Sequence, residues 1–354
     1  MDGDVKMSTF KTLVDAMTSV VANDTSNRAS DINNIQNALA DIVSGYSSGT
    51  LANPGQIVVV AKSGGDFTSL ASVPAAITDA SASKPYSILL MPGIYETSEV
   101  TLPNYVSIVG MDRKSCILKC TSNSEFVVKL KIWNMLTNLT VEHAGTITGK
   151  HAKTIVIDDD NSYIINCVIK NNATLSAGSY NAYSIYGGNS SDFYVYSSDI
   201  VCVNVGFING YGISISTEHD PRDFEIRDCS IMLGAGPSGE NIGVHVGNIV
   251  VNDGFIRGTK IQSNKKCIDL QSTAYVENCY LLSNTNAEST IDIHVHNAKF
   301  YNCTVRAVSP KLCFDTDGTY NISIAHCRMN LASPIHANLT NLITTPYNVA
   351  DTDV

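Results

Sequence analysis

The sequence predicts an all-β protein, a single-stranded right-handed parallel β-helix over residues 57–354 with short α-helices in front of it. Three observations support this prediction: a six-residue pattern that recurs along the chain, alternating apolar residues on both sides of each copy, and a low charge content. Of the 354 residues, 44% are hydrophobic and 16% are charged, so the chain can bury a large core.

The recurring pattern is an apolar residue, any residue, a turn-forming residue, a small residue, any residue and an apolar residue. The turn-forming residues predicted from it are Asn138, Asn166, Asn204, Asp228, Gly258, Asn278, Asn302 and His326. Asn, Asp, Gly and His adopt positive φ more readily than other residues, so each copy predicts a sharp bend between two short strands. Recurrence mostly at intervals in the twenties is typical of the coils of a solenoid.

Five cysteines follow the predicted turn residues directly and are therefore expected in equivalent, inward-facing positions. They are Cys167, Cys229, Cys279, Cys303 and Cys327. The ten cysteines show no metal-binding spacing with histidine, so we expect reduced thiols that are buried as small hydrophobic groups. Burial in apolar surroundings raises a thiol's pKa, which disfavours a catalytic role for them.

Residues 57–118 contain the segments VVVAKSGGDF, ILLMPGIYE and VSIVG, separated by a short helical pattern. This region resembles the start of pectin methylesterases and related pectin-lyase-like proteins. The resemblance implies a pectin-lyase-like β-helix and a helix near residues 69–80 that caps the N-terminal end of the solenoid.

The catalytic motifs of pectin methylesterases are missing from the sequence. That family uses two aspartates, one in a DFIFG-like strand, an arginine in an LGRPW-like motif, and glutamines that stabilise the oxyanion. The nearest match is Asp192 in DFYVY, which lacks the following glycine, and nothing matches the arginine motif. We therefore do not expect pectin methylesterase activity, because a fold does not determine a function.

Residues 1–44 are predicted to form an attachment or trimerisation segment, joined by a linker at residues 45–56. Apolar residues recur there with heptad spacing, at Phe10, Leu13, Met17 and Val20 and at Ile32, Ile35, Leu39 and Ile42. Isoleucine at both kinds of seam position favours a trimer or a higher bundle over a dimer, although the helices could instead pack on the first coils. The segment NRASDINNIQNALADIV resembles the N-terminal part of bacteriophage tail-fibre and tailspike proteins.

The charge balance and the absence of long apolar runs exclude several classes of partner. The net charge is −10 and no basic cluster is present, so nucleic acid is not an expected partner. No run of about 18 apolar residues could span a membrane, and no signal peptide is recognisable at the start. We expect a homotrimer in a virion, made in the host cytoplasm, with other virion proteins and a host-surface polysaccharide as partners and no cofactor.

Two sets of residues are candidates for a glycan site. The five tyrosines Tyr180, Tyr183, Tyr186, Tyr194 and Tyr196 lie close together in the longest predicted coil. Tyrosine combines an apolar ring with a polar tip, which suits contact with sugars, although the same rings could simply pack between coils. Glu218 and Asp220, together with Asp192, are the carboxylates that could act as acid and base in glycoside hydrolysis, although a solvated turn is the simpler interpretation.

The segment IDIHVHN alternates apolar residues with Asp292, His294 and His296, which could share one face of a strand. The spacing suits zinc or nickel, but no fourth ligand can be named, so no metal site is predicted.

Three functions remain open from the sequence. The first is a virion appendage that binds a glycan or docks to the virion, the second a tailspike-like depolymerase or deacetylase, and the third a cellular carbohydrate-active protein resembling pectin methylesterases. The sequence favours the first, in which binding rather than catalysis is the principal activity.

Overall fold

The computed structural model describes residues 56–188, 192–203, 206–215, 223–234, 241–247, 253–284, 289–307, 313–315, 322–329 and 343–344. The chain divides into two compact units, Met1–Ile57 and Val58–Val354. The predicted helical segment at residues 1–44 lies outside the described residues. No helix among the described residues is long and apolar enough to span a membrane.

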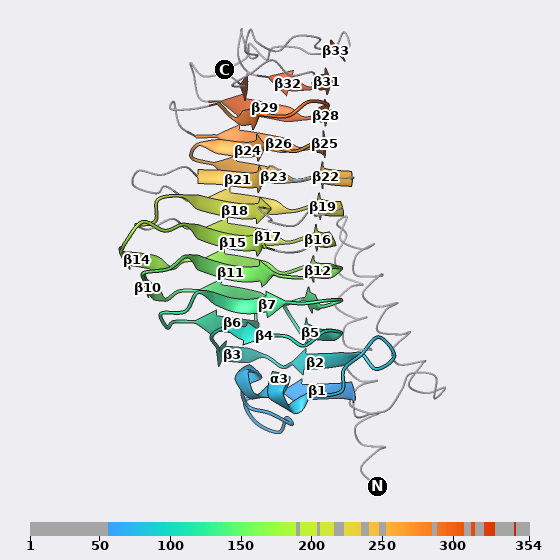
Figure 1. Ribbon diagram of the computed structural model, residues 1–354, viewed down its shortest axis with the longest axis vertical. Helices are drawn as coiled ribbons and strands as arrows, with labels where there is room; N and C mark the ends of the chain where they lie inside the picture. The colour runs from blue at the N-terminus through green and yellow to red at the C-terminus, as the bar shows by residue number, and fades with distance from the viewer. Residues whose placement is uncertain are drawn as a thin grey trace, which may run out of the picture. The chain divides into compact units, whose positions relative to one another are not determined.

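The second unit is a parallel β-solenoid, which confirms the predicted fold class (Figure 1). From β2 to β30 each coil contributes a strand to each of three sheets, here called sheets I, II and III, in that order along the chain. Sheet I contains β1 (Ile57–Val60), β2 (Tyr86–Leu90), β5 (Val106–Gly110), β8 (Met135–Thr137), β12 (Ser162–Ile165), β16 (Asp192–Tyr196), β19 (Asp223–Arg227), β22 (Asp253–Arg257), β25 (Tyr275–Glu277), β28 (Lys299–Tyr301), β31 (Ser323–Ala325) and β33 (Ile343–Thr344).

Sheets II and III are built in the same parallel manner, one strand above the next. Sheet II contains β3 (Gly93–Glu96), β6 (Cys116–Cys120), β9 (Thr140–His143), β13 (Val168–Asn171), β17 (Asp199–Cys202), β20 (Ser230–Leu233), β23 (Lys260–Ser263), β26 (Tyr280–Ser283), β29 (Thr304–Ala307) and β32 (Arg328–Met329). Sheet III contains β4 (Val100–Thr101), β7 (Phe126–Leu130), β11 (Ala152–Ile157), β15 (Ala182–Gly187), β18 (Gly210–Ile215), β21 (Asn241–Val246), β24 (Lys266–Leu270), β27 (Ile291–Ile293) and β30 (Phe314–Asp315). A separate parallel pair joins β10 (Thr146–Thr148) to β14 (Thr174–Ala177).

The bend from sheet I to sheet II has the predicted backbone conformation, with positive φ at the turn residue. All predicted turn residues that the structure describes have φ between 50° and 59°. Asparagine side chains also link successive bends: Nδ2 of Asn166 donates to Oδ1 of Asn138 at 3.0 Å, and Nδ2 of Asn302 donates to Oδ1 of Asn278 at 2.7 Å. The bends therefore stack along the solenoid and satisfy part of one another's hydrogen bonding.

One predicted turn residue is misplaced. Asn204 lies outside the described residues, and the bend between β16 and β17 is at Ser197, where φ is 49°. The coil there reads VYSSDI, so a serine takes the turn position and Ser198 takes the position usually held by cysteine. The sequence also predicts an insertion at residues 171–196, within the longest coil, and this is wrong: the stretch contains the end of β13 and the strands β14, β15 and β16.

Small groups stack on the inner side of this bend, as the sequence predicts. All ten cysteines are buried and none forms a disulfide. Ser198 and Thr259 take the same position in two of the coils that lack cysteine there, and each hydroxyl accepts a backbone N–H from the coil before it, from Cys167 and Cys229 respectively. Burial raises the pKa of Cys167 and of Cys229 to about 12, so these thiols stay protonated at neutral pH.

The core is one continuous stack of side chains enclosed by the three sheets. Aliphatic residues on successive strands, such as Ile155, Ile185 and Ile213, are fully buried, and Phe193 stacks on Phe224 with ring centroids 6.0 Å apart. Each fully buried aliphatic side chain contributes about 1.5–3 kcal/mol to stability relative to an exposed one. The regular stack fixes the register of every outward-facing residue.

A short helical segment lies at the start of the solenoid, within the range expected from the pectin-lyase-like resemblance. It comprises a 3₁₀ turn, η2 (Leu70–Ser72), and one α-helical turn, α3 (Val73–Ala76), and it is shorter than the expected range of 69–80. Ser69 caps η2 by accepting the N–H of Ala71. The helix ends because Ile77 is extended and buried, which leads the chain back to the core.

Candidate functional site

The outward face of sheet III carries two rows of side chains that run along the solenoid. The first row is Lys153, Tyr183, Tyr211, Ile242 and Lys266, and the second is Val156, Tyr186, Ser214, His245, Asp269 and Asp292. Parallel strands lie about 4.8 Å apart, so neighbours in a row are close enough to interact. The coils that contain β15 and β18 supply mainly aromatic residues, and the later coils that contain β21, β24 and β27 supply titratable ones.

The aromatic part of the face is centred on Tyr183. Its ring stacks on Tyr211 with centroids 4.9 Å apart and planes at 10°, and it lies 5.0 Å from the ring of Tyr186. Nζ of Lys153 lies 4.5 Å from the centre of the Tyr186 ring, a favourable cation–π contact. Tyr183 is only 9% exposed and its hydroxyl accepts a hydrogen bond from Asn181, so it supports the more exposed rings beside it.

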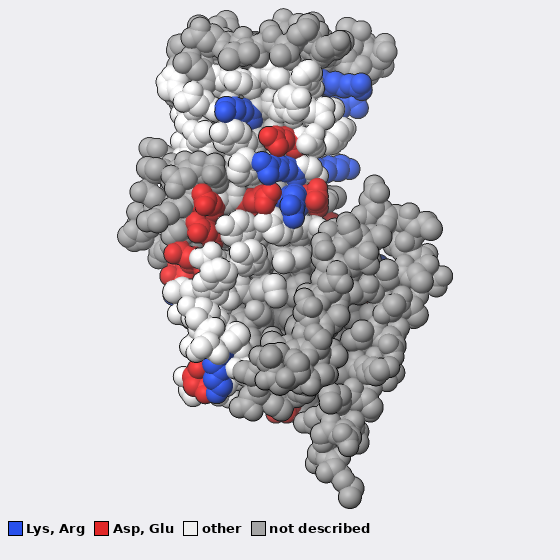
Figure 2. Space-filling view, turned by 90° about the vertical axis from the view of Figure 1, so that its right-hand side faces the viewer, with Lys and Arg blue, Asp and Glu red and all other residues white. Residues whose placement is uncertain are grey.

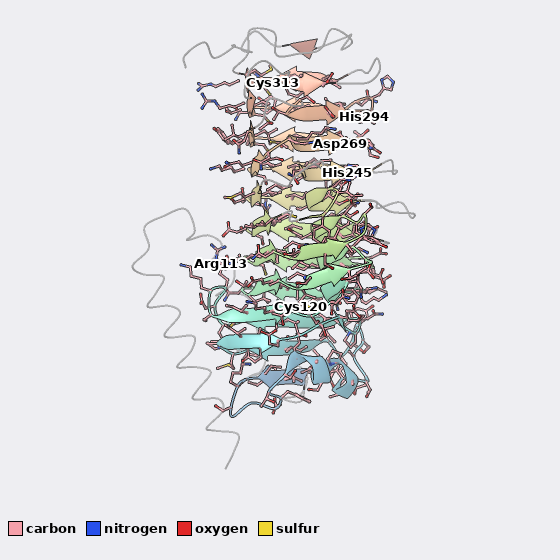
Figure 3. All side chains as sticks on the ribbon, turned by 90° about the vertical axis from the view of Figure 1, so that its left-hand side faces the viewer. Arg113, Cys120, His245, Asp269, His294 and Cys313 are labelled. Carbon is pink, nitrogen blue, oxygen red and sulfur yellow. The ribbon has the colours of Figure 1, made fainter. Side chains whose placement is uncertain are left out.

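The titratable part of the face is a carboxylate between two imidazoles (Figure 3). Nδ1 of His245 lies 2.9 Å from Oδ2 of Asp269, and Nε2 of His294 lies 3.5 Å from Oδ1. The second contact is within ion-pair distance, but Oδ1 is buried and has no partner that meets hydrogen-bond geometry. The Asp269 side chain is 8% exposed, so its interactions are little weakened by water.

A second ion pair borders this cluster one coil further along. Nζ of Lys266 lies 2.7 Å from Oδ2 of Asp292, with both side chains 13% exposed, and Ser289 donates to the other oxygen of Asp292. Both oxygens of Asp292 are therefore engaged, whereas His245 presents its remaining ring nitrogen away from Asp269.

The predicted strand carrying Asp292, His294 and His296 is shorter than expected. It ends at Ile293, and Asn297 adopts a positive φ of 66°, so His294 and His296 lie in a turn. His294 faces Asp269, whereas His296 is exposed. No group of three His, Cys, Asp or Glu residues is arranged to hold a metal ion in the part of the chain that the structure describes.

The five predicted glycan-binding tyrosines divide between two sheets. Tyr183 and Tyr186 lie on β15 in sheet III, and Tyr180 precedes that strand with its ring against His151 at 5.3 Å. Tyr194 and Tyr196 lie on β16 in sheet I. The tyrosines therefore form two separate aromatic surfaces.

The sheet I surface is a ladder of side chains that contact one another. Trp133 stacks on Tyr163 at 6.4 Å, and Tyr163 on Tyr194 at 4.8 Å. Further along, Arg257 pairs with both Glu225 and Glu277, at 3.4 and 3.1 Å. Figure 2 views the solenoid from the side where Figure 1 places the sheet I strands, and it shows acidic and basic side chains intermingled over the middle coils.

The candidate catalytic carboxylates are not assembled by the described residues. Glu218 and Asp220 lie outside them, in the connection between β18 and β19. Asp192 begins β16 on sheet I, and its Oδ1 accepts the backbone N–H of Asp223 at 3.2 Å. Asp192 is thus on a different sheet from His245 and Asp269.

The contact between His245 and Asp269, hereafter the acid–base pair, was missed by the sequence prediction. His245 and Asp269 are polar residues inside the apolar strands NIGVHV and KCIDL, and they are separated by 24 residues. Three of the spacings between predicted turns are also 24 residues, so the signal was a pair of polar strand residues one coil apart.

Comparison with known proteins gives limited similarity. No family model matches the chain, and no curated protein matches it. Among solved structures, a pectin methylesterase variant in complex with a hexasaccharide is similar at 14% identity and a TM-score of 0.40, covering 81% of this chain and 80% of that one.

Two further solved structures are similar at comparable levels. A pectin methylesterase from carrot has 14% identity and a TM-score of 0.39, covering 83% of this chain and 89% of that one. The catalytic domain of a family GH87 α-1,3-glucanase variant in complex with nigerose has 12% identity and a TM-score of 0.31, covering 83% and 69%. Similarity at this level does not identify a substrate, which must come from the chain's own residues.

Proposed function

We propose that this protein is a virion appendage whose solenoid binds a host-surface glycan along the outward face of sheet III. The observation that carries the proposal is that tyrosines and titratable side chains lie near one another on that face, with the ring of Tyr211 5.7 Å from the imidazole of His245. Sugar rings have apolar C–H faces and polar hydroxyl edges, so they bind to surfaces that combine aromatic rings with hydrogen-bonding groups. Tyr186 and Tyr211 supply the rings, and His245 supplies a polar group one coil away.

The repeat of the solenoid suits a linear polymer. Equivalent positions recur at about 4.8 Å along the axis, so a chain of sugars aligned with the axis meets the aromatic part and the titratable part in succession. The aromatic part is preorganised, because Tyr183 is stacked on Tyr211 and its hydroxyl is held by Asn181. Preorganised rings lose little conformational entropy on binding.

The test of glycan binding is a titration of the protein with capsular polysaccharides and lipopolysaccharides from candidate hosts. We expect Tyr211→Ala to weaken binding about tenfold or more, a loss of about 1.4 kcal/mol. Tyr194→Ala on sheet I is the matched control and should bind like the unmodified protein. Equal weakening by both variants, or by neither, would contradict the assignment to sheet III.

The virion part of the proposal rests on the heptad pattern of residues 1–44 and on its resemblance to tail-fibre and tailspike segments. A homotrimer of the full chain should be detected by light scattering, and a chain beginning at Gln56 should have a lower mass per particle. A monomer in both preparations would contradict the prediction that residues 1–44 form a trimer.

A depolymerase acting through Glu218, Asp220 and Asp192 is the second candidate function. In the sequence, Glu218 and Asp220 follow β18, the strand that carries Tyr211, by a few residues. New reducing ends formed from a bound polysaccharide and lost in Glu218→Gln or Asp220→Asn would support it. Binding without products would support the recognition protein.

A further inference from the structure

We propose that His245, oriented by Asp269, is a general base that activates water to hydrolyse an O-acyl ester on the bound glycan. This inference rests on the proposed glycan-binding function, because it places the ester on a sugar bound beside Tyr211. The protein would then remove acyl groups from the polysaccharide that it recognises.

The contact between His245 and Asp269 determines which ring nitrogen can act as the base. An ionised carboxylate only accepts hydrogen bonds, so Nδ1 of neutral His245 must carry the proton that points to Oδ2 of Asp269, at 2.9 Å. The lone pair is then on Nε2, which has no hydrogen-bond partner among the described residues. His245 is thus held in the tautomer that can accept a proton from water.

The position of Asp269 makes this arrangement rigid. Its side chain is 8% exposed and lies between His245, on the preceding strand β21, and His294, which directly follows the next strand β27. A buried carboxylate stabilises the imidazolium that forms when His245 takes a proton, because the opposite charges interact in a medium of low dielectric constant. Asp269 is therefore a positioning residue, and His245 is the catalytic residue.

The neighbouring groups favour water as the nucleophile. Ser214 lies next to His245 in the same row, but it is only 1% exposed, so its hydroxyl is not presented to a substrate. Cysteine cannot serve, since all ten cysteines are buried. The carboxylate of Asp292 already bonds Lys266 and Ser289, so it does not offer a free oxygen for attack on a sugar.

The aromatic part of the face supplies the position of the substrate. The ring of Tyr211 lies 5.7 Å from the imidazole of His245. A sugar ring in contact with Tyr211 therefore places its substituents within reach of the base, directly or through one water molecule. The class of substrate that fits is a polysaccharide with O-acetyl or similar O-acyl groups.

The reaction needs only water. Nε2 of His245 removes a proton from water while the water oxygen forms a bond to the acyl carbon. The tetrahedral intermediate then breaks the bond between the acyl carbon and the sugar oxygen, and His245 returns its proton to that oxygen. The products are the free sugar hydroxyl and the carboxylic acid, so no oxidant, reductant or cofactor is required.

The test measures acetate release from O-acetylated bacterial capsular polysaccharides and turnover of p-nitrophenyl acetate by the full chain. A general base contributes about 10²- to 10⁴-fold to a rate, so His245→Gln should lower both rates by at least 10²-fold. His296→Gln is the matched control, because His296 is exposed in the turn that follows β27. This control should keep the rate of the unmodified protein.

Two further variants separate catalysis from a structural role. Exogenous imidazole should restore part of the rate to His245→Gly, which a merely destabilised protein would not show. In Asp269→Asn the amide can donate to Nδ1 and stabilise the wrong tautomer, so the rate should fall about 10²-fold or more while glycan binding remains. Circular dichroism on each variant checks that the solenoid is folded.

The outcomes distinguish this inference from the proposed function. Binding of an acetylated polysaccharide without acetate release would overturn the inference and leave glycan binding intact. If no polysaccharide binds, the proposed function fails, and p-nitrophenyl acetate turnover that is unchanged in His245→Gln would overturn the inference as well. Acetate release that depends on His245 and is rescued by imidazole would support both.

Discussion

Sheets I and III expose faces built from the same coils, yet their side chains are used differently. On sheet I the rings of Tyr163 and Tyr194 stack on each other, and Arg257 binds two glutamates, so the side chains satisfy one another. On sheet III the acid–base pair of His245 and Asp269 leaves one imidazole nitrogen unengaged among the described residues. This difference is why we assign the proposed binding and chemistry to sheet III and a stabilising role to the side chains of sheet I.

The largest expected effect comes from adding a methyl group beneath sheet III. A Cβ at Gly243 would overlap Cγ2 of Ile261 and lie 2.5 Å from the carbonyl oxygen of Cys267. Since backbone atoms cannot yield easily, Gly243→Ala should lower the free energy of unfolding by about 3 kcal/mol. Urea denaturation followed by circular dichroism measures this change.

Gly234→Ala is the control for that substitution, since a Cβ there would meet nothing closer than 3.7 Å. It should change the free energy of unfolding by less than about 0.5 kcal/mol. Equal stability of the two variants would show that the path of β21 under the acid–base pair is not fixed by close packing.

A smaller effect is expected from interrupting the aromatic ladder on sheet I. Tyr194→Ala removes a ring that stacks on Tyr163 at 4.8 Å, and it should lower the free energy of unfolding by about 2 kcal/mol. Tyr194→Phe keeps the ring and should be nearly neutral. The difference is measured by chemical denaturation, and glycan affinity should be the same for both variants. A stable Tyr194→Ala protein that loses affinity would reverse the roles assigned to the two faces.

The stability of the protein should depend on pH through a histidine at the border between sheets II and III. His143 is fully buried at the end of β9, with Nε2 2.9 Å from the carbonyl oxygen of Ser124, and burial lowers the pKa of this imidazole. The unfolded chain then binds a proton more readily than the folded one, near the ordinary value of about 6.5. The stability that neutral His143 allows is therefore fully present above that pH, and the free energy of unfolding decreases as the pH falls below it.

The measurement for this pH effect is the urea midpoint between pH 7.5 and pH 5.0. His143→Gln cannot be protonated, so its midpoint should decrease less than that of the unmodified protein. His151, whose pKa is also lowered by burial, is present in both proteins and cancels in the comparison. Identical pH dependence would show that His143 does not contribute.

The smallest expected change in stability comes from removing the ion pairs of sheet I. The Arg257 side chain is 36% exposed, and ion pairs at such positions contribute little because water and salt screen them. Arg257→Ala should cost about 0.5 kcal/mol at low salt. A thermal denaturation series should show the difference shrink in 1 M NaCl, and a loss that persists there would indicate packing rather than charge.

The regular bend of the solenoid could be predicted from the sequence, because each coil needs a residue that readily adopts positive φ at the same position. Positive φ at Asn166 and Asn278 is easiest for a few residue types, so the pattern marks the coils. Ser197 escaped the pattern because serine adopts this conformation less readily, and the coil is held there by the hydroxyl of Ser198 instead.

The candidate site could be predicted only in part. Tyr183 and Tyr186 were found because tyrosines cluster in the sequence, but the division of the five tyrosines between two sheets depends on the corrected bend at Ser197. The pairing of His245 with Asp269 depends on the number of residues in the connections between strands. Those connections differ from coil to coil, so sequence spacing alone does not give the register.

Oxidative footprinting of the tyrosines with and without a bound glycan tests most directly that sheet III is the functional face. We expect the glycan to protect Tyr186 and Tyr211 from modification and to leave Tyr163 and Tyr194 unchanged. Protection of Tyr163 and Tyr194, with no change at Tyr186 and Tyr211, would contradict the account and move the binding surface to sheet I.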